Sequence, residues 1–145
     1  MPQIITHFPN IKKISMDNHF SKVKTYLQEL GYDITHEDPT DEVYVINDET
    51  NGIKNLVLDC EYPILVIEQY IFSLKDTNSD FYRRLLQKNR EIVHGAFVVD
   101  DSGKRVIFRD TLQLENLDLN ELEGTLNSLK LLVAEYSSDL LDMMK

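Results

Sequence analysis

Residues 78–114, NSDFYRRLLQKNREIVHGAFVVDDSGKRVIFRDTLQL, decide the fold of this chain. The first part of the stretch predicts a helix, because Phe81, Leu85 and Leu86 form an apolar stripe at helical spacing. Residues 96–108 then contain two short β-prone runs, AFVV and VIF, which are separated by a connection of hairpin length that starts with DDSG. The stretch therefore predicts a helix followed by a β-hairpin.

The chain before this stretch predicts another helix and the rest of a sheet. Residues 17–30 have the pattern of an amphipathic helix, and Gly31 follows as a left-handed stop. Later, Asn51-Gly52 tolerates positive φ at low cost and should reverse the chain between two strands of alternating polarity. The expected extended segments of this part are a short piece at residues 32–35 and strands at 43–46 and 53–60.

Residues 62–72, YPILVIEQYIF, form the least ordinary strand, because both of its faces are mostly apolar. A helix layer on one side of an antiparallel sheet covers only one of these faces. A loop or the amino-terminal segment could cover the other face, and so could a partner chain, since large exposed apolar patches mark interaction sites. A self-complementary dimer would supply that partner. The candidate residues of a dimer or client surface are Ile64, Val66, Tyr70 and Phe72.

The last element is a long helix with clear start signals. Asp118 and Glu121 predict a capping box, and Leu117 and Leu122 occupy the positions of a hydrophobic staple. Spacings of three and four suit a coiled coil, but the stripe is wide and favours a helix that lies across a sheet. Gly124 costs a helix up to ~1 kcal/mol against alanine, and the sequence gives no reason for it. The stripe consists of Leu119, Leu122, Leu126, Leu129, Val133, Tyr136, Leu140 and Met143.

Composition limits the class of protein. A length of 145 residues predicts one domain, residues 1–145, in which we expect residues 1–16 to form an extended or loosely ordered arm. The net charge of -10 disfavours nucleic acid as a partner, because binding to phosphates requires clustered cations. We expect neither a signal peptide nor membrane insertion, since the longest apolar run, residues 63–67, is far too short. The single cysteine excludes an intramolecular disulfide, which fits the cytoplasm.

No pattern of catalytic or metal-binding residues is evident. The four histidines lack the spacing that brings two ligands onto one helix face. Cys60 would be a nucleophile only beside a base such as His36 or His94, so a buried small hydrophobe is the better interpretation. Asp100 and Asp101 precede Ser-Gly and are typical turn formers rather than an acid–base pair. We therefore expect no enzymatic activity, no cofactor and no metal.

A basic group on the predicted central helix stands out in an acidic chain. Such a group is usually a solvated helix face, although it could receive an acidic segment of a partner. Its residues are Arg83, Arg84, Lys88 and Arg90.

The predicted order of elements is α-β-β-β-α-β-β-α, with the extra extended piece after the first helix. This order, together with residues 52–68 and the segments LLQKN (85–89) and HGAF (94–97), resembles the YbjN-type domain family, whose members are often labelled Tir-chaperone-like. The resemblance covers nearly the whole chain after about Asp17. It implies an α+β fold of the type III secretion chaperone kind, with an antiparallel sheet and flanking helices. It also implies a homodimer that holds a partner polypeptide on apolar surface, and it carries over no catalytic residues.

These observations predict a non-catalytic, chaperone-like protein-binding module. An extended client segment would bind along apolar grooves or a sheet edge, where backbone hydrogen bonds give affinity and side-chain pockets give selectivity. Two alternatives stay open. One is a small-molecule-binding or enzymatic domain with a pocket near Cys60, His36 or His94, and the other is a regulatory subunit of a larger assembly.

Overall fold

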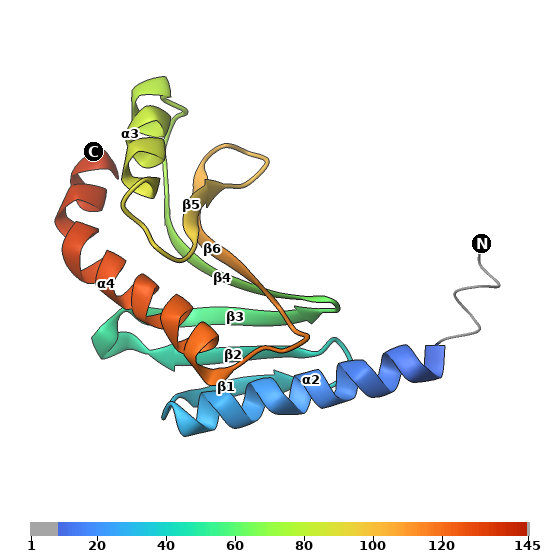
Figure 1. Ribbon diagram of the computed structural model, residues 1–145. Helices are drawn as coiled ribbons and strands as arrows, with labels where there is room; N and C mark the ends of the chain where they lie inside the picture. The colour runs from blue at the N-terminus through green and yellow to red at the C-terminus, as the bar shows by residue number, and fades with distance from the viewer. Residues whose placement is uncertain (1–8, 145) are drawn as a thin grey trace.

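The computed structural model describes residues 9–144, with side chains described for residues 19–139 and for Asp142. These described residues form an α+β fold with a six-stranded sheet and three α-helices (Figure 1). The elements are α2 (Pro9–Glu29), β1 (Asp33–Asp38), β2 (Val43–Asp48), the 3-10 turn η1 (Glu49–Asn51), β3 (Ile53–Glu61), β4 (Ile64–Ser73), α3 (Ser79–Asn89), β5 (Ala96–Val99), β6 (Arg105–Gln113) and α4 (Leu119–Met144).

All strand pairs of the sheet are antiparallel, and the strand order is β1-β2-β3-β4-β6-β5. The first four strands follow one another as a meander. The chain then leaves the sheet through α3 and returns as the predicted β5–β6 hairpin, with β6 beside β4. This arrangement puts β4, the strand that the sequence made unusual, near the middle of the sheet, with β1 and β5 as the edges.

The helices bury their apolar stripes against one face of the sheet. Figure 1 shows α4 crossing in front of β2 and β3, while α2 runs along the β1 side. The core joins stripe residues of both helices to the inward side chains of the strands, and the sequence prediction of a helix across the sheet is confirmed for α4. Representative core residues are Val23, Leu27, Tyr44, Leu58, Ile67, Phe108, Leu122, Leu126 and Leu129.

The boundaries of α2 agree with the sequence prediction at one end only. The helix ends before Gly31, which has φ of 84°, and the N–H of Tyr32 donates to the carbonyl of Leu27 at 3.0 Å. At the other end α2 already begins at Pro9. Residues 9–16, which we expected in an extended or loosely ordered arm, are therefore helical, and residues 1–8 lie outside the described residues.

The short extended piece after the first helix is a full strand. β1 pairs with β2 along its whole length, so four strands rather than three precede α3. The sequence underestimated this strand because Ile34 is its only apolar residue in DITHED. An edge strand can be mostly polar, since one of its sides has no neighbour.

β4 changes the direction of its side chains once, at a bulge. Leu65, Ile67 and Gln69 point into the core, as strict alternation requires. The register with β6 then shifts between Tyr70 and Phe72, so that the alternation starts again one residue later. As a result Phe72 is only 5% exposed and packs edge-on against Phe81 of α3, with ring centroids 5.8 Å apart.

Candidate functional site

The face of the sheet opposite the helices carries three of the four residues predicted for a partner surface. On β4, Ile64 is 40% exposed, Tyr70 is 47% exposed, and Val66 between them is half-buried. These side chains alternate with the buried positions of the strand, so they share the other face of the sheet. The fourth predicted residue, Phe72, does not join them, because the bulge turns its side chain into the core.

Neighbouring strands extend this apolar surface. Residues that pair directly across antiparallel strands share a face, so the register places Ile107 of β6 beside Tyr70 and Thr111 beside Val66. The same rule adds valines from β2, β3 and β5. We call this surface the open sheet face; its apolar residues are Val43, Val45, Val57, Ile64, Val66, Tyr70, Val98 and Ile107.

Charged residues divide the open sheet face. An ion pair of 3.0 Å joins Glu68 of β4 to Arg109 of β6 near its centre. On β3, burial raises the pKa of Asp59 to about 6, and the nearby carboxylates of Glu61, Asp41 and Glu68 act in the same direction. The face therefore has apolar side chains on β4 on both sides of the Glu68–Arg109 pair, and it is acidic towards the end of β3.

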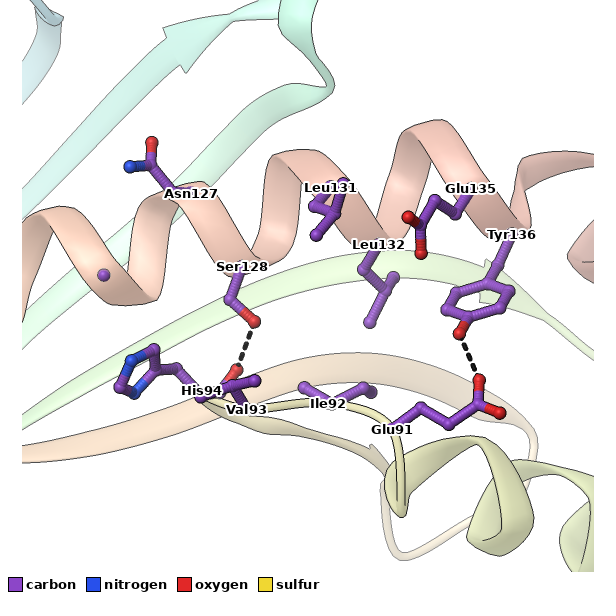
Figure 2. A pocket seen from close by; sticks show the side chains of 11 residues that line it. Glu91, Ile92, Val93, His94, Asn127, Ser128, Leu131, Leu132, Glu135 and Tyr136 are labelled. Atoms are coloured by element: carbon purple, nitrogen blue, oxygen red, sulfur yellow. Dashed lines mark hydrogen bonds between the residues drawn. The ribbon is translucent and has the colours of Figure 1, made fainter.

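A second candidate site is a cavity of about 190 Å³ on the helix side of the molecule, between residues 91–94 and α4 (Figure 2). We call it the loop–helix cavity. Figure 2 shows Ile92 and Val93 on the loop facing Leu131 and Leu132 on the helix. Its remaining lining residues are Glu91, His94, Gly124, Asn127, Ser128, Glu135 and Tyr136.

Two hydrogen bonds fix the distance between the walls of this cavity. The hydroxyl of Ser128 donates to the carbonyl of His94 at 2.7 Å, and the hydroxyl of Tyr136 donates to the carboxylate of Glu91 (Figure 2). A Cβ on Gly124 of the helix would lie 3.1 Å from Nε2 of His94 on the loop. This close approach is the physical reason for the glycine that the sequence left unexplained.

The Tyr136 end of the loop–helix cavity is acidic. The hydrogen bond to Glu91 raises the pKa of Tyr136 to about 12, and the carboxylates of Glu135 and Asp139 add to this effect. Lys88 lies 3.2 Å from Asp139 and 4.3 Å from the centre of the Tyr136 ring, so it balances the charge of Asp139. Glu135, by contrast, makes no ion pair within the part of the chain that the structure describes.

The predicted basic group is partly occupied by contacts inside the chain. Arg83 pairs with Asp80 in the first turn of α3, and Lys88 pairs with Asp139 of α4. Arg84 and Arg90 are exposed. The group is therefore a dispersed helix surface rather than four free cations.

The three residues considered for a chemical pocket lie in separate places. Cys60 is in the core, where burial raises the pKa of its thiol to about 12. His36 is exposed on the edge strand β1 and lines a surface cavity with Lys24 and Tyr32. His94 lines the loop–helix cavity.

The carboxylates considered as an acid–base pair belong to a turn, as expected. The hydroxyl of Ser102 donates to Asp100 at 2.6 Å, and this bond lowers the pKa of Asp100. The described residues include no group of three or more histidine, cysteine, aspartate or glutamate side chains placed to hold a metal ion. None of the helices between residues 9 and 144 is both long enough and apolar enough to cross a membrane.

Sequence reasoning missed the loop–helix cavity. Leu131 lies beside the predicted stripe of α4, and Val93 falls in a loop, so neither had a periodic signal. The two residues form a site only because the α3–β5 connection returns to α4, nearly forty positions later in the chain. The only local signal in the sequence is the apolar pair Ile92-Val93 in an otherwise polar connection.

Comparison with solved structures finds the same fold. YbjN from E. coli matches with a TM-score of 0.63 at 9% identity, over 83% of this chain and 92% of that chain. The HopA1–SchA chaperone–effector complex contains a chain that matches with a TM-score of 0.57 at 15% identity, over 79% of this chain and 90% of that chain. No curated protein matches the sequence significantly.

The match to a family model extends over nearly the whole chain. The model CesT_Tir_1 matches residues 16–145, which include every strand and most of the three helices. This match and the structural likeness confirm the resemblance to YbjN-type, Tir-chaperone-like domains that the sequence indicated. The chain therefore belongs to the CesT_Tir_1 family.

Proposed function

We propose that this chain is a non-catalytic, chaperone-like module that holds another polypeptide, and that it acts as a homodimer in the cytoplasm. The observation that carries the proposal is the open sheet face, on which Ile64 and Tyr70 stay 40% and 47% exposed. The helices pack on the opposite face, so their stripes do not cover these side chains. The chaperone–effector complex among the similar structures supports the same kind of role.

The chemistry of the open sheet face suits a protein partner. Val66 lies between the two exposed residues, and Ile107 continues the apolar surface onto β6. Burial of apolar surface contributes about 25 cal/mol per Å², which makes the apolar side chains of this face a source of affinity. The Glu68–Arg109 pair at its centre supplies polar groups that can fix the orientation of a partner.

A sheet edge offers a second mode of contact for an extended client. β1 is the longer of the two edge strands, with six residues against four in β5. Backbone groups on its outer side can pair with an added strand. The carboxylates of Asp33, Glu37 and Asp38 would favour a client segment that is not acidic.

Substitution of Tyr70 by aspartate tests the dimer. The charge falls on the open sheet face at a side chain that is half exposed, so Tyr70→Asp should weaken self-association more than folding. Leu86→Asp is the matched control, because Leu86 is 68% exposed on α3, away from this face. Sedimentation should show a dimer for the wild type and the control and a monomer for Tyr70→Asp. Unchanged monomers for all three proteins would reject the dimer.

A regulatory subunit is distinguished from a chaperone by what the chain binds. A chaperone should suppress the aggregation of an unfolded segment, whereas a subunit should copurify with one partner at fixed stoichiometry. Copurification from the native cell therefore decides between them.

A further inference from the structure

We propose that the loop–helix cavity is a second docking site, which takes a segment of a partner polypeptide carrying one or two apolar side chains followed by lysine or arginine. The inference goes beyond the proposed function, which concerns the open sheet face. Both have the chain hold another polypeptide, but the two surfaces lie on opposite sides of the sheet and are altered by different variants.

The apolar part of the site comes from side chains that the chain leaves exposed on both walls. Val93 is 84% exposed, the largest fraction among the large apolar side chains of the described residues, and Leu131 opposite it is 58% exposed. Ile92 and Leu132 line the same cavity at greater depth. Its volume of about 190 Å³ exceeds the ~30 Å³ that one water molecule occupies in the liquid, so the cavity can admit an apolar side chain.

The basic part of the partner follows from the charge at one end of the cavity. Glu91 and Glu135 both line it, and only Asp139, a neighbour of these carboxylates, is balanced by Lys88. Tyr136 donates a hydrogen bond to Glu91 and adds no positive charge. A cation that follows the apolar anchor would therefore meet two carboxylates, in the direction away from His94.

The site is also held in shape before anything binds. The Ser128–His94 and Tyr136–Glu91 hydrogen bonds join the loop to α4 at both ends of the cavity. On the other side of the loop, the amide of Asn89 bonds the backbone N–H and C=O of Phe97 at 2.8 and 3.1 Å. A partner then meets a formed surface, which lowers the entropic cost of binding.

The test uses two short blocked peptides and the full chain labelled with 15N. One peptide carries two leucines followed by two arginines, and the matched peptide carries two leucines followed by two glutamates. The arginine peptide should shift the amide signals of residues 91–94 and 124–136, and it should bind at least about tenfold more tightly than the glutamate peptide. Added salt should weaken its binding, since Glu135 is exposed.

Three variants connect the binding to the cavity. Leu131→Ser should weaken binding of the arginine peptide about tenfold, through lost apolar contact. Glu135→Gln should weaken it severalfold and reduce its salt dependence. Glu123→Gln removes the same charge from an exposed position of α4 outside the cavity and should bind like the wild type.

Each other outcome overturns the inference. These outcomes are failure of the arginine peptide to bind, binding no tighter than that of the glutamate peptide, and shifts confined to residues of the open sheet face. If Glu123→Gln weakened binding of the arginine peptide as much as Glu135→Gln does, the preference for arginine would come from the net charge of the protein and not from the cavity. A change from dimer to monomer in Leu131→Ser would mean that a second copy occupies the cavity. Because Tyr70→Asp is tested separately by sedimentation, failure of this inference and failure of the proposed dimer are distinguishable.

Discussion

At the scale of single residues, Gly124 couples the stability of α4 to the position of the loop at His94. Alanine would favour the helix by up to ~1 kcal/mol. Its Cβ, however, would lie 3.1 Å from Nε2 of His94, so the imidazole has to move by a few tenths of an ångström. The two effects oppose each other, so Gly124→Ala alone should change the free energy of unfolding by less than the propensity gain.

A double-mutant cycle measures this coupling. In the background of His94→Ala the imidazole next to position 124 is absent. Gly124→Ala should then stabilise the protein by about 1 kcal/mol. Urea unfolding of the four proteins gives the coupling energy. An equal gain with and without His94 would show that the imidazole does not limit the position.

Asp59 gives the second prediction at this scale, a stability that depends on pH. Its pKa is raised to about 6 in the folded chain, above the usual value of 3.8, by burial and by Glu61, Asp41 and Glu68. The folded state therefore binds this proton more tightly than the unfolded state does. Stability should fall as the pH rises from about 4 to about 7, because the ionised carboxylate is penalised only in the fold.

Asp59→Asn should remove that decline and make the protein more stable than the wild type at pH 7. Asp80 and Asp100 do not interfere, because their lowered pKa values place their contributions below about pH 4. Asp76→Asn, at an exposed position between β4 and α3, is the control and should keep the wild-type pH dependence. Urea unfolding of the three proteins at pH 4.5 and pH 7 gives the change in the free energy of unfolding between the two pH values. If Asp59→Asn lost as much stability over this range as the wild type, the assignment to Asp59 would be contradicted.

At the scale of elements, the start of α4 shows what a local signal can predict. The backbone N–H of Glu121 donates to Oδ1 of Asp118 at 2.8 Å, and the staple residues Leu117 and Leu122 are both buried. Asp118→Ala should cost about 1 kcal/mol of stability, since it removes the cap. The neighbouring exposed Asn120→Ala should cost much less, and thermal or urea unfolding would measure both. Equal losses would mean that the cap contributes little here.

The sequence predicted the elements whose signals are local. The helix at α3, the stop at Gly31 and the β5–β6 hairpin with its DDSG turn all depend on residues a few positions apart, and the structure confirms them. Of the predicted apolar stripe of α3, Phe81 and Leu85 are buried, but Leu86 is 68% exposed. Two features were beyond this reasoning. β1 is too polar to stand out as a strand, and the bulge in β4 depends on its register with β6, a strand more than thirty residues later. Simple alternation placed Phe72 on the wrong face for that reason.

At the scale of the whole molecule, a homodimer on the open sheet face should show itself in thermal stability. Association stabilises the folded state by mass action, so the Tm of the wild type should rise with protein concentration. The Tm of Tyr70→Asp should not, while Leu86→Asp should behave like the wild type. Calorimetry over a hundredfold range of concentration would test this. A wild-type Tm that is independent of concentration would argue against the dimer.

The two candidate sites differ in how far the sequence could reveal them. The apolar run of residues 62–72 predicts excess apolar surface, and three of its four candidate residues do lie together on the open sheet face. The loop–helix cavity gave no comparable signal, because its walls come from a loop and a helix that meet only in the folded chain. Hydrophobic periodicity predicts one helix or strand at a time, so it cannot predict a contact between a loop and a distant helix.

The bulge in β4 determines which face of the sheet two neighbouring aromatic side chains occupy. Because of the bulge, the side chain of Tyr70 lies on the open sheet face, while that of Phe72, two positions later, packs against Phe81 of α3 on the core face. Without the bulge, regular alternation along β4 would place Phe72 on the open sheet face, away from the ring of Phe81. A partner bound at Tyr70 would therefore lie on the opposite side of the strand from the Phe72–Phe81 contact at α3.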